Sequence, residues 1–280
     1  MKTLVLNSTN VVNDGFNNKL TYNFPNGGVN LSGYEVAVNT IQIYFSWFNI
    51  SSTLYNNSAF SYKWFDGQTY NVQIPDGYYQ VDDLNNFLEA TFLTNNHYMI
   101  DNQHNPIYFI SLQTNPTFYA IQLTCSPLSS ALATTWTKPA GATWNVPAAP
   151  VTPYFNVLSN GLQTILGFNA GQFPSTPQAS TFYQNSQYCP EEQPVSSILV
   201  STSLVSNPLS VPSNIIYSFA PDVDFGSLIS SKAYTYAWAD VVGGHYSQFT
   251  LSFIDQNYQP IKILDKAMVV TLVFREKNSN

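Results

Sequence analysis

Three histidines, His97, His104 and His245, are the first side chains to consider for chemistry, because imidazole binds metals and transfers protons near neutral pH. His97 and His104 flank one short segment, a spacing that can bring two ligands together. No cysteine or third histidine is close to them in sequence, and the HxH pair of metal-binding cupin strands is absent. The sequence therefore predicts no metal site and two solvated loop histidines.

Motifs of nucleophilic, phosphoryl-transfer and redox catalysis are absent from the sequence. It contains no GxSxG elbow, no Walker or GxGxxG glycine loop, no HExxH and no CxxC pair. Asp224-Phe225-Gly226 matches the DFG of kinases, but the HRD loop and the strand lysine are missing. We therefore expect no enzymatic activity, no catalytic residues and no cofactor.

Two further possibilities involve sugars, their hydrolysis and their binding. Glycoside hydrolysis needs two facing carboxyl groups, and the spacing selects no pair among Asp76, Asp82, Asp83, Glu191, Glu192, Asp222, Asp224 and Asp255. Trp136, Trp144 and Tyr154 lie in a proline-rich stretch and form a candidate platform on which a sugar can stack. The alternative is that these three aromatic side chains pack the stretch itself.

The composition favours a protein that makes wide contacts with other proteins. Hydrophobic residues are 44% of the 280, enough for a sizeable core, whereas charged residues are only 9% against an ordinary ~25%. An uncharged polar surface rich in aromatic residues costs less to desolvate than one of lysine and glutamate. The net charge of −7 with scattered lysines argues against nucleic-acid binding.

The cysteines and the apolar runs restrict the cellular context. Cys125 and Cys189 lack metal-binding spacing; a bridge between them stays open, and reduced buried thiols are our expectation. The N-terminal run Leu4-Val5-Leu6 is too short for a signal peptide, and no run is long enough for a membrane span. We expect a protein that is not secreted.

One amphipathic helix stands out in a sequence dominated by strand patterns. After the turn residues Pro75-Asp76-Gly77, apolar side chains recur at three- and four-residue spacing over residues 81–92, and Gln80 or Asp82 can cap the helix. Alternating patterns predict eight to ten strands, with a bulge near Asn39-Thr40 and hairpins over Asp66-Gly67, Asn115-Pro116 and Gly243-Gly244. The pattern is that of a sandwich or jelly roll.

The middle of the chain differs in composition. Residues 126–195 are rich in proline, alanine, serine and threonine, and only LQTILGF at 162–168 suggests a helical turn, ended by Gly167. Because a structureless loop of this length is unusual in a compact domain, we expect an inserted loop region or small subdomain. The expected organisation is an N-terminal arm at 1–33, a jelly-roll domain at 34–275 with this insertion, and a tail at 276–280.

Several motifs together resemble one viral family. IPDGYYQVDDLNNFLEATF at 74–92 resembles the turn-helix of capsid proteins in virophages and polinton-like viruses, and LGF at 166–168 is a second recurrent element. VSSILVSTSL, VPSNIIYSFAPDVDFGSLI and FTLSFIDQNYQPIKILDKAMVVTLVF resemble the C-terminal half of that group. The resemblance covers most of residues 34–275. Because the length suffices for only one jelly roll, the match is to the penton, or minor capsid, protein.

The resemblance implies a structural virion protein and no catalytic residues. It implies an all-β fold, a single jelly roll of eight antiparallel strands in a β-sandwich with one short helix and an insertion. It implies homopentamers at the fivefold vertices of an icosahedral capsid, in contact with the major capsid protein and assembled in the host cytoplasm or a viral factory. The alternatives are a carbohydrate- or receptor-binding jelly-roll module for a host or giant-virus surface glycan, and another single-jelly-roll minor capsid protein.

Overall fold

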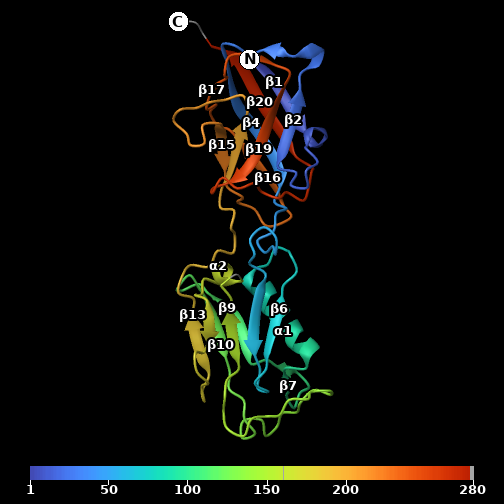
Figure 1. The fold of residues 1–280 in the computed structure, drawn as a ribbon, viewed down its shortest axis with the longest axis vertical. Helices are drawn as coiled ribbons and strands as arrows, with labels where there is room; N and C mark the ends of the chain where they lie inside the picture. Colours follow the sequence, from blue (N-terminus) through green and yellow to red (C-terminus); the bar gives the residue numbers. More distant parts are fainter. Residues whose placement is uncertain (160, 278–280) are drawn as a thin grey trace. The chain divides into compact units, whose positions relative to one another are not determined.

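The computed structural model describes residues 1–159 and 161–277 and divides the chain into two compact units. Unit 1 consists of Met1–Trp47 and Val195–Asn280, and unit 2 consists of Phe48–Pro194 (Figure 1). In the described residues strands dominate, and both α-helices belong to unit 2. The chain is therefore mostly β, as the sequence predicts.

Unit 1 contains a five-stranded and a four-stranded antiparallel sheet. The first has the order β1 (Lys2–Asn7), β20 (Val269–Glu276), β4 (Tyr34–Tyr44), β16 (Leu228–Lys232), and β17 (Ala239–Asp240) also pairs with β4. The second has the order β15 (Ile215–Phe219), β14 (Ile198–Thr202), β19 (Gln248–Asp255), β2 (Lys19–Asn23). A short pair, β3 (Val29–Asn30) with β18 (His245–Tyr246), and the 3-10 turns Ser8–Asn10 and Pro25–Gly27 complete the unit.

The eight long strands of unit 1 pair as four nested couples. In chain order the first pairs with the eighth, β1 with β20, and the second with the seventh, β2 with β19. The third pairs with the sixth, β4 with β16, and the fourth with the fifth, β14 with β15. A long hairpin that folds over itself produces this nesting, with alternate couples in alternate sheets. The arrangement is jelly-roll-like.

A β-bulge in β4 keeps one face of that strand in the core. Thr271 of β20 pairs with Thr40 and Leu272 pairs with Val38, so Asn39 is the extra residue. The extra residue reverses the alternation, and so the even-numbered Val36 and Val38 and the odd-numbered Ile41 and Ile43 are all buried. The predicted bulge is confirmed.

The two sheets of unit 1 meet at two flanks. β1 and β2 are edge strands, and they form the β1–β2 flank; β15 and β16 are the opposite edge strands, and they form the β15–β16 flank. On the second flank Tyr217 Oη lies 3.0 Å from Ser231 Oγ, which joins the edges of the two sheets. We call the end of the sandwich where β4 begins the Tyr34 end, and the other the Tyr44 end.

Unit 2 combines two larger sheets with helices. Its sheets have the orders β12 (Gly171–Phe173), β11 (Tyr154–Val157), β5 (Ala59–Lys63), β6 (Thr69–Gln73), then β13 (Phe182–Asn185), β10 (Ala120–Cys125), β9 (Ile110–Asn115), and β7 (Met99–Ile100) with β8 (Pro106–Ile107). The hairpins β5–β6 and β9–β10 confirm two predicted hairpins, the first with Gly67 at φ 81° in its turn. The predicted helical turn is α2 (Gln163–Leu166), ended by Gly167 at φ 70°.

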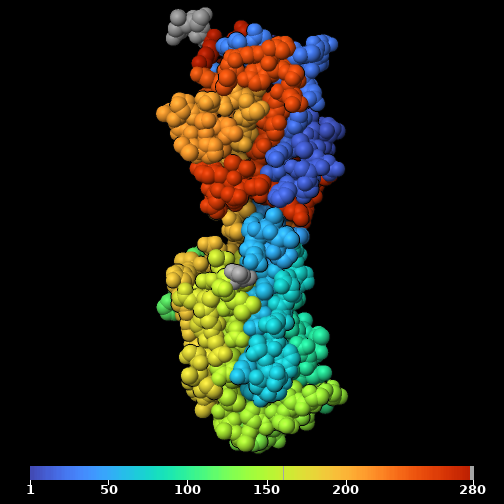
Figure 2. All heavy atoms as spheres, in the orientation of Figure 1, coloured from blue at the N-terminus to red at the C-terminus, as the bar shows by residue number. Residues whose placement is uncertain are grey.

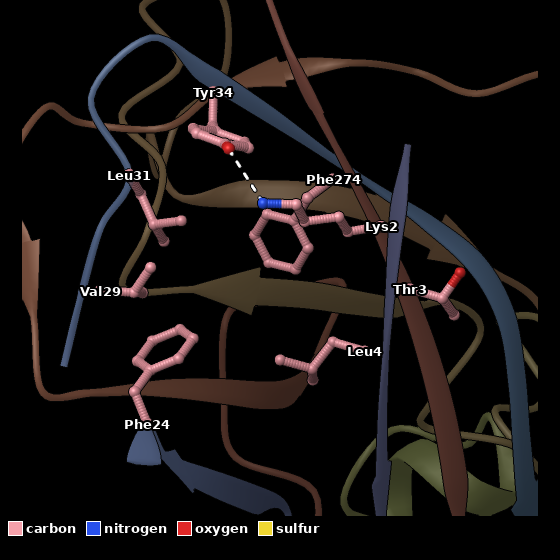
Figure 3. A pocket seen from close by; sticks show the side chains of 8 residues that line it. All are labelled: Lys2, Thr3, Leu4, Phe24, Val29, Leu31, Tyr34 and Phe274. Carbon is pink, nitrogen blue, oxygen red and sulfur yellow. Dashed lines mark hydrogen bonds between the residues drawn. The ribbon is translucent and has the colours of Figure 1, made fainter. Parts of the chain in front are cut away.

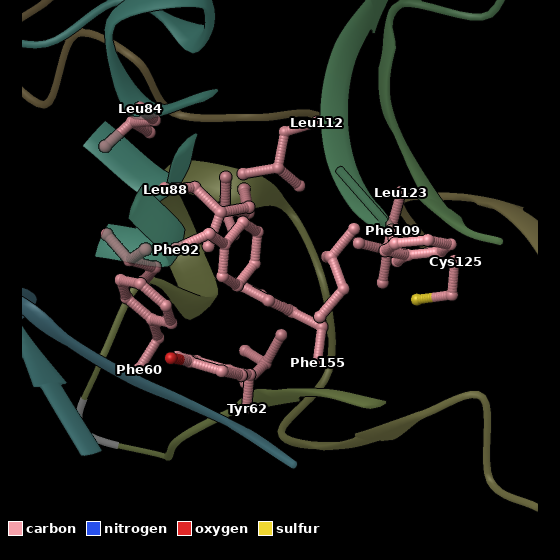
Figure 4. Packing of buried hydrophobic residues seen from close by; sticks show 14 of the residues in the cluster. Phe60, Tyr62, Leu84, Leu88, Phe92, Phe109, Leu112, Leu123, Cys125 and Phe155 are labelled. Carbon is pink, nitrogen blue, oxygen red and sulfur yellow. The ribbon is translucent and has the colours of Figure 1, made fainter. Parts of the chain in front are cut away.

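Helix α1 (Val81–Asn95) covers the core of unit 2. Its backbone N–H at Gln80 donates to Asp83 Oδ2 over 3.0 Å, a cap at the positive end of the helix. Leu84, Leu88 and Phe92 are buried among strands and aromatic side chains (Figure 4). The polar residue Asn85 also ties the helix to a sheet, because its Oδ1 accepts a hydrogen bond from the N–H of Leu112 on the edge strand β9. The predicted helix is confirmed.

The two ends of unit 2 are close together. Asn49 Nδ2 donates to the carbonyl oxygen of Glu192 over 2.8 Å and to that of Tyr79 over 2.7 Å. The chain thus leaves unit 1 after β4 and returns before β14 at neighbouring points. An insertion with adjacent ends leaves the host sheets uninterrupted.

The units do not coincide with the boundaries expected from the sequence. The expected arm, 1–33, contributes β1 and β2 to the two sheets of unit 1, and the inserted unit begins at Phe48 instead of residue 126. β11 and β13 of the expected insertion at 126–195 pair with β5 and β10, so these strands belong to sheets that begin earlier in the chain. Of the expected tail at 276–280, Glu276 ends β20, and residues 278–280 lie outside the described residues.

The hairpin predicted over Gly243-Gly244 is wrong. β17 pairs with β4, whereas β19 pairs with β14 and β2. A two-residue hairpin loop needs positive φ at its turn residues, and neither glycine adopts it.

We predict that unit 1 folds without unit 2. Replacing residues 48–194 by a short glycine-serine linker should leave the sandwich folded, because Asn49 and Glu192 already lie within a hydrogen bond of each other. The amide spectrum of the shortened chain should keep the dispersion and slow hydrogen exchange of β4 and β20. A collapsed spectrum would show that the sheets of unit 1 depend on unit 2.

Candidate functional site

The three aromatic residues of the candidate sugar platform occupy different surroundings in unit 2. Trp144 is buried, with 3% of its surface exposed, and its ring meets those of Trp64 and Phe65. Trp136 is half-buried and its ring lies edge-on to Phe109. Tyr154 is on β11, where the Nζ of Lys63 lies 5.7 Å from its ring centroid.

The buried Trp144 is held by polar contacts as well as by packing. Its Nε1 donates to the carbonyl oxygen of Asn96 over 2.7 Å, and Lys138 Nζ donates to the carbonyl oxygen of Trp144 over 2.8 Å. The Asn96 contact places the ring at the C-terminal end of α1. A sugar cannot stack on this ring unless the core opens, so the structure presents no exposed platform that contains all three residues.

His97 is buried, and not a solvated loop residue as the sequence suggested. Its Nδ1 lies 2.8 Å from Tyr62 Oη, which also accepts a hydrogen bond from Asn95 Nδ2 over 2.8 Å. Trp64 stacks on the imidazole at 4.7 Å between ring centroids, and Tyr70 meets it edge-on at 4.5 Å. Because Tyr62 accepts from Asn95, its own proton is available for Nδ1 of a neutral His97.

Burial decides the charge of His97. Desolvation lowers its pKa to about 4, against a smaller opposing effect of the negative Asp66. Asp66 itself accepts the hydroxyl of Tyr70 over 2.7 Å. His104 lies apart from this cluster, exposed in a tight loop with φ 67°. The two histidines therefore do not form a metal-binding pair.

Three of the eight candidate carboxylates, Asp76, Asp83 and Asp255, accept hydrogen bonds that hold local structure. Asp76 accepts hydrogen bonds from Ser51 Oγ over 2.8 Å and from the Ser52 N–H over 2.7 Å. Asp255 accepts the N–H groups of Asn257 and Gln259, both over 2.8 Å. Burial, and secondarily the negative charge of Asp82, raise the pKa of Glu192.

The two cysteines are free thiols in different environments. Cys125 is buried, and desolvation raises the pKa of its thiol to about 12, which suppresses reactivity. Cys189 is exposed, so the expectation of two buried thiols is wrong for this residue. Its surroundings had no regular apolar pattern from which burial could be judged.

An apolar cavity opens on the β1–β2 flank of unit 1, at the Tyr34 end. It has a volume of about 190 Å³, and Figure 3 shows its walls: Lys2, Thr3, Leu4, Phe24, Val29, Leu31, Tyr34 and Phe274. Small-molecule sites usually occupy about 300–1,000 Å³. The cavity is therefore sized for an inserted side chain instead of a cofactor, and we call it the flank cavity.

A polar chain closes one side of the flank cavity. Lys2 Nζ donates to Tyr34 Oη over 3.3 Å (Figure 3). The Tyr34 hydroxyl in turn donates to Glu276 Oε1 over 2.7 Å. The ammonium group also lies 5.5 Å from the centroid of the Tyr34 ring. The charges at the rim are thus already satisfied within the chain, and the open part of the cavity is apolar.

No motif in the sequence identifies the flank cavity directly. Residues 1–33, the expected N-terminal arm, contribute six of its eight lining residues. The individual side chains were missed, because the cavity forms only where β1, β20 and the turn after β2 converge. Within the described residues, no group of three or more histidine, cysteine or acidic side chains is placed to hold a metal ion, and no helix is long and apolar enough to span a membrane.

Comparison with known proteins gives a distant likeness among solved structures. No protein-family model and no curated protein matches the chain. Among solved structures it is similar to the crystal structure of the SeMet-labelled mavirus penton protein, with a TM-score of 0.44 and 11% identity over 98% of this chain and 97% of that one. A likeness this distant transfers no residue role to the present chain.

We predict that unit 2 loses stability as the pH falls from about 6.5 to about 4. The unfolded chain binds a proton at His97 near the ordinary pKa of about 6.5, whereas the folded unit resists protonation until about pH 4, so the loss is on the order of 3 kcal/mol. The free energy of unfolding of unit 2 can be measured at several pH values by urea unfolding, monitored through hydrogen exchange in residues 80–95. His97→Gln should flatten this pH dependence and exposed His104→Gln should not; equal pH dependence in all three proteins would contradict the assignment.

We also predict that Trp144 contributes to stability and not to surface binding. Trp144→Ala should destabilise unit 2 by about 3–5 kcal/mol, because it leaves a cavity and removes the donor to Asn96. Trp136→Ala, in a half-buried position, should cost clearly less. Chemical unfolding of the two variants tests this order, and glycan binding lost in a stably folded Trp144→Ala protein would reverse the interpretation.

Proposed function

We propose that this chain is a structural virion protein, a penton or minor capsid protein whose unit 1 is a single eight-stranded jelly roll. The nested pairing of the eight long strands carries the proposal. Two-sheet jelly rolls occur in viral capsid proteins, lectins and cupins, so the choice among these classes depends on the other residues of the unit.

The residues of unit 1 favour the capsid class over the other two. A cupin holds its metal with several side chains inside the sandwich, and only one of the three histidines, His245, belongs to unit 1. The aromatic residues considered for sugar binding belong to unit 2, and Trp144 among them is buried. The motifs in the C-terminal half that resemble virophage capsid proteins lie in the strands of unit 1.

The low charge of the chain supports an assembly role. With 9% charged residues, the surfaces of both units consist largely of serine, threonine, asparagine, glutamine and tyrosine. Their desolvation costs less than that of charged groups, which favours wide and permanent subunit contacts. We propose a homopentamer at the fivefold vertices of an icosahedral capsid, in contact with the major capsid protein, with unit 2 on the outer side of the shell.

A pentamer is a ring of heterologous contacts. In such a ring one flank of each subunit meets a different flank of the next, and the rotation between neighbours closes the ring at five. A sandwich with two unlike flanks is suited to this arrangement, since the same pair of surfaces is used at every contact. No enzymatic step and no cofactor enter this function.

The mass of the assembly in solution tests the proposal. Light scattering after size exclusion should give about 157 kDa, five times the 31.3 kDa of the chain, and negative-stain images should show rings. A trimer would favour another single-jelly-roll minor capsid protein that forms a capsomer. A monomer that persists at high concentration, with and without the major capsid protein, would refute a vertex role.

A further inference from the structure

The loop between β14 and β15 exposes apolar side chains at its tip. Leu209 is 94% exposed and Val211 is 83% exposed, and Pro208 and Pro212 flank them. Scattered exposed apolar residues are normal, but four apolar residues within five positions form a small protruding patch. We call residues 207–213 the apolar loop.

The apolar loop is held in shape by its own hydrogen bonds. Asn207 accepts at Oδ1 from the N–H of Leu209 over 2.9 Å, and its N–H donates to the carbonyl oxygen of Ser213. Ser210 Oγ donates to the carbonyl oxygen of Pro212 over 2.9 Å. Because little freedom remains to be lost, the loop can bind a partner at low entropic cost.

The apolar loop and the flank cavity lie at the same end of unit 1 on opposite flanks. β14 ends at the Tyr34 end, because Val205 shortly after it pairs with Val241, whose N–H donates to the carbonyl oxygen of Tyr34. β15 begins at this end and is an edge strand of the β15–β16 flank. The flank cavity is at the Tyr34 end of the β1–β2 flank. Figure 2 shows the two flanks of unit 1 on opposite sides, the first residues in blue and the region of the loop in orange. A knob and a cavity at one level on opposite flanks fit a head-to-tail contact between copies.

The charges of the two flanks are complementary. Residues 195–232, which include β14, the apolar loop, β15 and β16, contain three exposed charged side chains, Asp222, Asp224 and Lys232, a net charge of −1. Residues 1–33, which include β1 and β2, contain two lysines and one aspartate, a net charge of +1. Asp222 and Asp224 follow β15 at the Tyr44 end, and Lys19 begins β2 at that same end of the other flank. Lys19 already pairs with Asp14 over 3.7 Å, so the charge attraction at the Tyr44 end is small beside the apolar contact at the Tyr34 end.

We propose that the apolar loop of one copy inserts Leu209 into the flank cavity of the next copy, between Val29 and Leu4. This contact rests on the proposed homopentamer and specifies its interface. A single anchor in a cavity of about 190 Å³, surrounded by polar neighbours, has the size and placement of an interface hot spot. The two surfaces are different, so the contact is heterologous and repeats around a ring.

A cross-linking experiment tests the contact. Two proteins are made in a Cys189→Ser background, because Cys189 is exposed: one also carries Leu209→Cys and the other Val29→Cys. Mixed and mildly oxidised, they should form a disulfide-linked pair that contains both proteins. Phe118→Cys, exposed in the β9–β10 turn of unit 2 and outside both surfaces, replaces Leu209→Cys in the matched control and should not link to Val29→Cys.

The assembly itself gives a second readout. The double variant Leu209→Ser, Val211→Ser should raise the concentration needed for assembly at least tenfold, whereas Phe118→Ser in unit 2 should leave it unchanged. Five-subunit rings without the Leu209–Val29 link would overturn the contact and leave the proposed function standing. A linked pair in a protein that forms no five-subunit rings would support the contact and count against a fivefold ring. If the mixture is oxidised at high concentration and the Leu209–Val29 link does not form, the proposed contact is wrong, even if the free protein is monomeric.

Discussion

The antiparallel ladder between β4 and β20 is the interaction on which unit 1 depends. It pairs β4, which precedes unit 2 in the sequence, with β20, the last strand of the chain. It also places β20 between β1 and β4 in the sheet. The ladder spans both sides of the bulge at Asn39, so one face of β4 stays in the core along its length. Without it, the couples β1–β20 and β4–β16 would not be joined into one sheet, and the flank cavity would lose Phe274.

Local patterns in the sequence predicted local structure well. The hairpins β5–β6 and β9–β10, helix α1, the turn at α2 and the bulge near Asn39 all follow from turn residues and from side-chain periodicity within a few positions. Partners far apart in the chain were beyond these signals. The alternation of residues 59–65 is the same whether β5 pairs with β11 of unit 2 or with a strand of the sandwich, so the boundary at Phe48 was not visible.

The chemistry of individual side chains was harder to predict than the strands. His97 follows α1 in a polar stretch of sequence, yet Tyr62, Trp64 and Tyr70 from the β5–β6 hairpin enclose it. The flank cavity likewise combines side chains from both ends of the chain, and no local sequence pattern marks any of them as lining a cavity. In both cases the surroundings come from tertiary packing between distant segments, and residue spacing in a single sequence does not predict such packing.

The path of the chain into and out of unit 2 has a mechanical consequence. The connections follow β4 and precede β14 at the Tyr44 end, and each of these strands lies between two neighbours in its sheet. Tension transmitted along these two strands would load their ladder hydrogen bonds in shear on both sides of each strand at once. A strand at the edge of a sheet would have such bonds on one side only. Attachment through interior strands therefore resists tension along the strands better than attachment through edge strands would.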